Sequence, residues 1–260
     1  RVSCSPRSTT GAAVGAAWRS LVAAEPVVVI TGGTEGVGQA LVRRFVARGV
    51  QVVTCARRPR ELPGATVVAA DVTRAEDRAR LVTVARARGG VVGLINNAAI
   101  QRPHRLAEGG ASPQDLEVEL HTNLLAPIAL GQMLLGDLAA HGGFLANVSS
   151  GLAYVPHARA PVYCATKAGL SHYTRSAQRQ HPGVRLVEIV LPMVDTAMTR
   201  GRGRGKLSAD EAARQIVAGL DAGRETIWVG KARLLPWLLR LVPGLITDLL
   251  GRAEHEAPSV

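Results

Sequence analysis

Val27-Val-Val-Ile-Thr-Gly-Gly-Thr-Glu-Gly-Val-Gly38 joins a run of four apolar residues to a turn rich in glycine. An amphipathic segment, Gln39–Arg48, follows the turn, and a second apolar run, Val50–Cys55, comes directly after Gly49. Strand, turn, helix and strand in this order form a β-α-β unit, whose two strands are parallel. This motif therefore predicts a fold built on a parallel sheet.

The alternation of apolar runs and helical patterns continues along the chain. Further buried strands are predicted at Val67–Ala70, Gly93–Asn96, Phe144–Ser149, Leu186–Leu191 and Ile227–Val229. Helices are predicted near Arg74–Ala87, Pro113–Leu138, Pro161–Gln180 and Ala209–Ala222. Strands that alternate with helices give a parallel sheet covered on both faces. We therefore predict an α/β fold: a single doubly wound Rossmann-type domain with a parallel seven-stranded sheet and helices on both faces.

Both ends of the chain differ in composition from this domain, which we expect over residues 25–230. Residues 1–24 are rich in small residues and arginine, and their apolar run is too short for a signal peptide, so we expect a disordered tail. Residues 231–260 contain an apolar helical stretch interrupted by Arg240, Asp248 and two prolines. We expect this extension to pack on the substrate site or a subunit interface, and contact with a membrane surface is the alternative.

The net charge of +11 raises the question of a nucleic-acid partner. The arginines are scattered through every segment, however, and the local cluster of Arg202, Arg204 and Lys206 has no interleaved aromatic residues. We therefore expect no nucleic-acid partner. A basic interaction protein is the alternative, and it would depend on this cluster.

Cysteine spacing and hydropathy bear on the compartment. Cys4, Cys55 and Cys164 form neither a disulfide framework nor a metal-ligand pattern, so we expect no metal and a cytoplasmic location. The chain has no stretch of 18 or more uninterrupted apolar residues, so we expect no membrane-spanning helix, and packing of residues 231–260 on the protein is favoured over membrane contact.

The glycine turn predicts a dinucleotide site. Glycine at positions 32, 36 and 38 permits a tight turn, close approach of the backbone to a pyrophosphate, and close packing of the helix on the strand. The N-terminus of that helix offers N–H donors to the anion. Because the glycines come after a predicted strand and before a predicted helix, they indicate a dinucleotide site more specifically than glycines alone would.

The end of the second strand bears on the choice of dinucleotide. Arg57 and Arg58 follow Ala56, so no carboxylate repels a 2′-phosphate and two guanidiniums are available to bind it. We therefore expect NADP(H) to be preferred over NAD(H). Two observations oppose this preference. Two arginines are weaker evidence for a phosphate site in a chain that is rich in arginine, and the Glu35 carboxylate in the glycine turn would face that phosphate. Asp71, at the end of the third strand, is a candidate partner for the adenine amino group.

Tyr163 and Lys167 are the candidate reacting groups. Their spacing places both on one helical face, where an ammonium would stabilise a phenolate and lower its pKa. Ser150 comes thirteen residues before Tyr163, at the end of a predicted strand, where its hydroxyl can bind a carbonyl oxygen that gains negative charge. Asn123, within a long predicted helix, could hold a water beside Lys167, although core hydrogen bonding would also explain a mid-helix Asn.

Together these motifs resemble the short-chain dehydrogenase/reductase family over Val27 to about Gly230. The resemblance rests on the glycine turn, Asn96-Asn-Ala-Ala99, Asn123, Asn147-Val-Ser-Ser150, Tyr163-x-x-x-Lys167 and Leu191-Pro-Met-Val-Asp-Thr196, in the family's order and spacing. It implies a catalytic tetrad of Asn123, Ser150, Tyr163 and Lys167. With the residues derived above, the cofactor set is Gly32, Thr34, Glu35, Gly36, Val37, Gly38, Arg57, Arg58, Asp71, Val72, Asn97, Ala98, Ala99, Tyr163, Lys167, Pro192, Val194 and Thr196.

The resemblance also implies individual roles: Lys167 binds the nicotinamide ribose, and Val194 and Thr196 hold the carboxamide. Two positions depart from the family pattern, since Ala99 and Met193 stand where glycine is usual. Neither change removes a reacting group, but the methionine side chain would narrow the substrate site.

We therefore expect an NADP(H)-dependent carbonyl reductase or alcohol dehydrogenase with Tyr163 as acid/base. Alternatives are an enzyme of the same fold with non-redox chemistry, such as isomerisation or dehydration, or a nucleotide-sensing regulator. Leu152, Tyr154 and Val155 in a variable segment favour a hydrophobic substrate. By resemblance, the two long central helices would pack into a homodimer or homotetramer.

Overall fold

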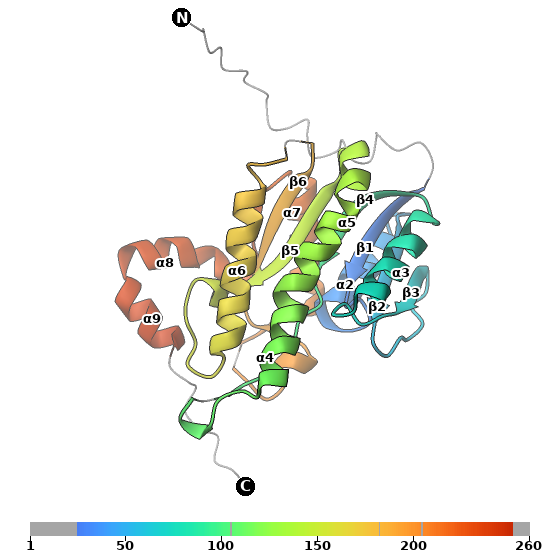
Figure 1. The fold of residues 1–260 in the computed structure, drawn as a ribbon. Helices are drawn as coiled ribbons and strands as arrows, with labels where there is room; N and C mark the ends of the chain where they lie inside the picture. Colours follow the sequence, from blue (N-terminus) through green and yellow to red (C-terminus); the bar gives the residue numbers. More distant parts are fainter. Residues whose placement is uncertain (1–24, 105, 182, 204, 252–260) are drawn as a thin grey trace, which may run out of the picture.

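The computed structural model describes residues 25–251 except 105, 182 and 204, so the predicted tail over 1–24 and residues 252–260 lie outside it. Seven strands form one parallel sheet in the order β3-β2-β1-β4-β5-β6-β9, which confirms the predicted fold class (Figure 1). The strands are β1 (Pro26–Thr31), β2 (Gln51–Ala56), β3 (Ala65–Ala69), β4 (Gly90–Asn96), β5 (Phe144–Ser150), β6 (Arg185–Leu191) and β9 (Thr226–Trp228).

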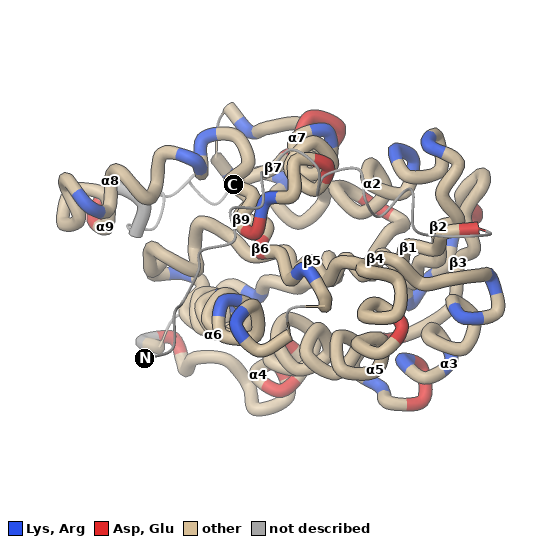
Figure 2. The backbone as a smooth tube through the Cα atoms, turned by 90° about the horizontal axis from the view of Figure 1, so that it is seen from above, with Lys and Arg blue, Asp and Glu red and all other residues tan. Residues whose placement is uncertain are grey.

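Helices cover both faces of the sheet (Figure 2). On one face α2 (Gly36–Val46) packs beside α7 (Ala209–Asp221). The other face carries α3 (Ala75–Arg86), α4 (Pro113–Leu120), α5 (Ala126–Ala140) and α6 (Pro161–Ala177). Because both faces are covered, the central strands are apolar throughout, and Val27 to Ile30 are fully buried.

The long predicted helix near Pro113–Leu138 is interrupted in the structure. Its start is as expected, because the Ser112 hydroxyl accepts from the backbone N–H of Asp115 at 3.1 Å and a proline follows the cap. A π-turn, η2 (His121–Leu125), then separates α4 from α5. Such turns are often found at functional sites, and this one contains Asn123.

By length and composition alone, the helical run Pro113–Ala140 is the one in the described chain that would suffice to cross a membrane. Leu130, Leu134 and Leu138 of α5 are fully buried against the sheet. One face of α5 therefore belongs to the core of this fold.

Shorter elements complete the carboxyl edge of the sheet. Two-residue strands β7 (Val194–Asp195) and β8 (Leu207–Ser208) pair in parallel after β6, and neither was predicted. The remaining short helices are η1 (Leu106–Glu108), η3 (Gly151–Ala153) and η4 (Ala197–Thr199).

The C-terminal segment folds as a helical hairpin that projects from the sheet (Figure 1): η5 (Gly230–Leu234), α8 (Leu235–Leu241) and α9 (Pro243–Gly251). Leu235 and Ile246 are buried against Val155. The outer face is apolar and open to solvent, with Trp237 67% exposed and Leu241 73% exposed.

Candidate functional site

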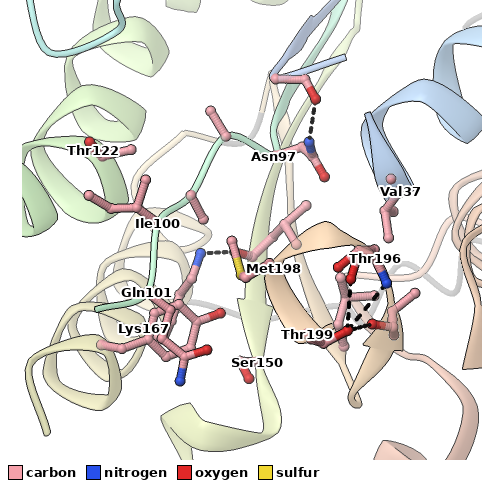
Figure 3. A pocket seen from close by; sticks show the side chains of 18 of the residues that line it. Val37, Asn97, Ile100, Gln101, Thr122, Ser150, Lys167, Thr196, Met198 and Thr199 are labelled. Carbon is pink, nitrogen blue, oxygen red and sulfur yellow. Dashed lines mark hydrogen bonds between the residues drawn. The ribbon is translucent and has the colours of Figure 1, made fainter. Parts of the chain in front are cut away.

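A cavity of about 1200 Å³ opens at the carboxyl edge of the sheet, where the loops after β1 to β6 meet (Figure 3). Crevices at this edge are where ligands bind in open α/β sheets. The predicted catalytic and cofactor residues line it, with two exceptions, Gly38 and Asn123. The sequence motifs are thus brought to one place although they come from distant parts of the chain.

The glycine turn lies between the ends of β1, β2 and β4. Gly32 and Gly36 have φ angles of +66° and +54°, which residues with a side chain rarely adopt. A Cβ at Gly33 would lie 2.1 Å from the Thr54 hydroxyl oxygen, which accepts a hydrogen bond from the Gly33 N–H at 3.0 Å. Thr54 is a residue that the sequence motifs did not single out, and it ties the turn to β2.

Gly38 does not line the cavity, and its contact with the cofactor stays a prediction. A Cβ at this position would lie 2.2 Å from the Gly32 carbonyl oxygen and 2.6 Å from the Asn97 side-chain nitrogen. That nitrogen donates to the carbonyl oxygens of Thr31 and Gly32 at 3.0 and 3.2 Å. Gly38 therefore lets α2 pack against the turn from behind.

The loop after β6 closes the cavity opposite the glycine turn. Thr196 faces Gly36, at which a Cβ would lie 3.0 Å from the threonine methyl group, and Figure 3 places Thr196 close to Val37. The Thr199 hydroxyl donates to the Val194 carbonyl oxygen at 2.5 Å and accepts from the Thr196 N–H at 3.2 Å. These bonds hold the two predicted carboxamide-binding residues in a fixed turn.

Ser150, Tyr163 and Lys167 meet at the end of β5 and the start of α6. Tyr163 is buried and lines the cavity together with Ser150, whose side chain acts on the pKa of Tyr163. The Lys167 ammonium lies 5.7 Å from the centre of the Tyr163 ring and donates to the Val148 carbonyl oxygen at 2.7 Å. A hydroxyl pair beside a buried amine is an arrangement suited to binding and protonating a carbonyl oxygen.

Asn123 supports this group from behind rather than lining the cavity. Its side chain accepts from the Ile100 N–H at 2.9 Å, donates to the Ile100 carbonyl oxygen at 2.8 Å, and donates to the Thr166 hydroxyl at 3.2 Å. The residue thus joins the loop after β4 to α6, between Tyr163 and Lys167. That Asn123 holds a water beside Lys167 stays a prediction.

Comparison with known proteins identifies the family. Residues 26–206 match the short chain dehydrogenase family. The chain belongs to this family. The uncharacterized oxidoreductase DltE of Bacillus subtilis is 30% identical over 221 residues, which cover 77% of this chain and 86% of that protein. L-fucose dehydrogenase of Bos taurus is 35% identical over 158 residues, 58% of each protein.

Solved structures agree in fold. A short chain dehydrogenase from Burkholderia cenocepacia, in complex with NADP, superimposes with a TM-score of 0.78 at 25% identity, covering 87% of this chain and 97% of that one. A short-chain dehydrogenase from Sphingobium yanoikuyae, in complex with NADPH, has a TM-score of 0.72 at 22% identity and covers 90% and 99%. The protein is therefore an oxidoreductase of a family that uses nicotinamide dinucleotides.

The cavity of this dehydrogenase fits a dinucleotide. Gly32 and Gly36 line the cavity without side chains of their own, which leaves room for a pyrophosphate at the N-terminus of α2, whose N–H groups would bind it. At the β2 end, Arg57 and Arg58 are exposed and line the cavity. The Glu35 carboxylate was the argument against a phosphate at this end of the cavity. It lies 3.4 Å from the Arg60 guanidinium, which offsets its charge. The sequence motifs did not single out Arg60. The Asp71 carboxylate accepts from the Thr73 N–H and hydroxyl at 2.9 and 2.8 Å.

The substrate end of the dehydrogenase cavity is bounded by apolar side chains from three segments, among them Leu152, Val155 and Leu235. Met193, the departure from the family pattern, also lines it and is 43% exposed. The metal-ligating side chains of the described residues form no group of three that could hold an ion.

Burial sets the titration of the two reacting groups. Burial raises the pKa of Tyr163 to about 12, and the Ser150 side chain acts on that pKa in the lowering direction with a smaller effect. Burial lowers the pKa of Lys167 to about 8. The expectation that the ammonium brings the tyrosine pKa below its ordinary value is therefore wrong for this structure, because loss of hydration outweighs other effects at the phenol.

The Lys167 shift has a measurable effect on stability. Between pH 8 and 10.5 the folded chain has lost a proton that the unfolded chain still holds, so this group makes the free energy of unfolding rise with pH. We expect wild type to gain up to about 3 kcal/mol relative to Lys167→Met across this window. Denaturant melts at a series of pH values measure the difference. Lys231→Met, which removes an exposed lysine, is the control, and equal pH profiles for wild type and Lys167→Met would contradict the assignment.

Proposed function

We propose that this protein is an NADP(H)-dependent carbonyl reductase or alcohol dehydrogenase with Tyr163 as its acid/base. The observation that carries the proposal is that the side chains of Ser150 and Tyr163 line one cavity, with Lys167 one helical turn from Tyr163. When bound, the dinucleotide supplies the hydride for the carbonyl carbon. The proton for the carbonyl oxygen comes from the phenol of Tyr163.

The side chains of the site divide this work. The Ser150 hydroxyl, which accepts from the Leu152 N–H at 3.1 Å, is oriented to donate to the carbonyl oxygen. Burial keeps Tyr163 protonated and thus able to act as the acid in the reducing direction. Lys167, held by the Val148 carbonyl, lies where it can return a proton to the phenolate. In the oxidising direction the same groups work in reverse.

The preference for NADP(H) is supported by charge at the β2 end of the cavity. Arg57 and Arg58 offer two guanidiniums to a 2′-phosphate, and the acid nearest the glycine turn, Glu35, has its own partner in Arg60. Two structural relatives were solved with NADP and NADPH. Their cofactors support the same choice here.

We also propose a homo-oligomer in the cytoplasm that acts on a hydrophobic carbonyl or alcohol. Leu120 and Leu125 are 40% and 48% exposed on the outer side of the α4–α5 run, an apolar surface suited to a second subunit. Gel filtration at the mass of a dimer or tetramer would support this state, and a monomer alone would contradict it. Cys55 and Cys164 are free thiols, which suits a reducing compartment.

Replacement of Tyr163 by Phe tests the chemistry. We expect NADPH consumption across a panel of ketones and aldehydes to fall by at least about a hundredfold in kcat, because the proton donor is lost. Binding of NADPH, followed by its fluorescence, should fall far less. Tyr173→Phe removes a hydroxyl from the same helix outside the cavity and should keep turnover. Tight NADPH binding without turnover in wild type would instead favour non-redox chemistry.

Replacement of Arg57 and Arg58 by Ser tests the choice of cofactor. We expect Kd for NADPH to rise by at least about tenfold, because charge-assisted hydrogen bonds to the phosphate are lost, while Kd for NADH changes little. Fluorescence titrations with both dinucleotides measure the ratio. Arg88→Ser, on an exposed arginine outside the cavity lining, is the control. A ratio that does not move would remove these two residues from the phosphate site.

A further inference from the structure

Charge is distributed unevenly along the cavity wall. The two carboxylates that line it, Glu35 and Asp71, both lie at the β1–β3 end, where the dinucleotide phosphates and adenine are expected. At the opposite end, beside β5, β6 and β9, the lining contains Arg159, Arg202 and Lys231 and, among the described residues, no carboxylate. The substrate end of the site is therefore positively charged.

Arg202 is the best placed of these cations. It is half-buried, and one terminal nitrogen donates to the Gln101 side-chain oxygen at 3.0 Å while the other donates to the Met198 carbonyl oxygen. Figure 3 places Gln101 and Met198 together in the pocket. A guanidinium has five N–H donors, and both of these acceptors are neutral. The side chain is thus fixed in position while its charge and several donors stay available.

Arg202 lines the same cavity as the reacting tyrosine. Ser150, Tyr163 and Arg202 are all part of its wall. The Glu119 carboxylate acts on the pKa of Tyr163 in the raising direction, and the Arg202 guanidinium acts on it more weakly in the lowering direction. An anion bound by Arg202 would share the cavity with the reacting hydroxyl, so both can belong to one small molecule.

Arg159 and Lys231 lie on segments joined to the one that holds Arg202. The Arg159 carbonyl oxygen accepts from the His104 N–H at 3.2 Å, in the segment that also contributes Gln101. The Lys231 ammonium lies 3.9 Å from where a Cβ at Gly205 would be, three residues from Arg202. Neither side chain has a carboxylate partner among the described residues.

The acids close to this end do not point into the cavity lining. Asp115 pairs with Arg102, and Asp195 pairs with Lys206 at 3.1 Å. Glu119 is buried behind the wall, where burial raises its pKa, and its Oε1 atom has no hydrogen-bond partner among the described residues. None of the three lines the cavity, so an incoming anion would meet the cations without a competing carboxylate.

We propose that the substrate is a carbonyl compound with an anionic oxygen group, a carboxylate or a phosphate, that Arg202 binds. Arg159 and Lys231 add positive charge at the cavity wall, while Leu152, Val155 and Leu235 contact the apolar part of the substrate. The inference rests on the proposed reductase activity, which it narrows to a substrate class.

Matched substrates test this assignment. Each probe pairs an anion with its neutral analogue: 4-oxopentanoate and 5-oxohexanoate against their methyl esters, and dihydroxyacetone phosphate against dihydroxyacetone. We expect wild type to prefer the anion of at least one pair in kcat/KM by at least about tenfold, mainly through KM. The carboxylate and phosphate pairs distinguish the two sources of the anion.

Arg202→Gln should lower the ratio of kcat/KM for anion over neutral analogue by at least about tenfold, and Arg202→Lys should restore part of it. Because each ratio is internal to one variant, a general loss of activity cancels. Arg200→Gln, on an exposed arginine two residues away and outside the cavity lining, is the control. Equal use of anion and neutral analogue by wild type, or an unchanged ratio in Arg202→Gln, would overturn the proposal.

Binding separates this inference from the reductase activity. Calorimetry compares 4-phenylbutanoate with 4-phenylbutanamide on the NADP-loaded protein. If no carbonyl is reduced, but the carboxylate binds more tightly than the amide only when Arg202 is present, the anion site stands and the proposed reaction fails. Equal binding of the two probes to wild type would reject the anion site.

Discussion

The close approach of the glycine turn to the ends of β2 and β4 is the constraint from which the site follows. Thr54 occupies the space that a Cβ at Gly33 would need, and its hydroxyl also donates to the Ile30 carbonyl oxygen at 2.5 Å. On the other side the Thr31 hydroxyl accepts from the N–H groups of Asn97 and Ala98, both at 3.0 Å. Each such buried bond contributes about 1 kcal/mol, but their geometric effect is larger, because they fix three strand ends relative to one another.

Buried amides extend this order to the catalytic helix. Asn96 donates to the Asn147 side-chain oxygen at 2.8 Å, and Asn147 donates to the Thr174 hydroxyl at 2.9 Å, which links β4, β5 and α6. Asn123 donates to the Thr166 hydroxyl at 3.2 Å, so α6 is held at two points along its length, Thr166 and Thr174. Apolar packing tolerates small shifts, whereas directional hydrogen bonds between buried side chains favour one arrangement. The positions of the reacting side chains on α6 are thus defined by residues that do not touch the cavity.

The pattern of apolar residues predicted the sheet because parallel strands are buried on both faces and are therefore apolar along their whole length, as Val27 to Ile30 are. The π-turn at His121–Leu125 could not be predicted, since it is accompanied by bonds from Asn123 to residues distant in sequence. The two-residue strand β7 is too short to have a period. The catalytic motifs were found because their spacing is local, but the titration of Tyr163 depends on burial, which spacing does not contain.

The many arginines of the chain differ in function according to where the fold places them. In the sequence the arginines are scattered, and in the fold many outer ones are paired with carboxylates, as with Arg43 and Asp210 at 2.9 Å or Arg86 and Asp137 at 2.8 Å. What distinguishes Arg57, Arg58 and Arg202 is their place on the cavity wall, where the described structure gives none of them a carboxylate partner. Within a cavity of low polarity, unpaired charge acts more strongly than the same charge on an open surface. The electrostatic character of the site therefore follows from which cations are left unpaired rather than from the net charge of the chain.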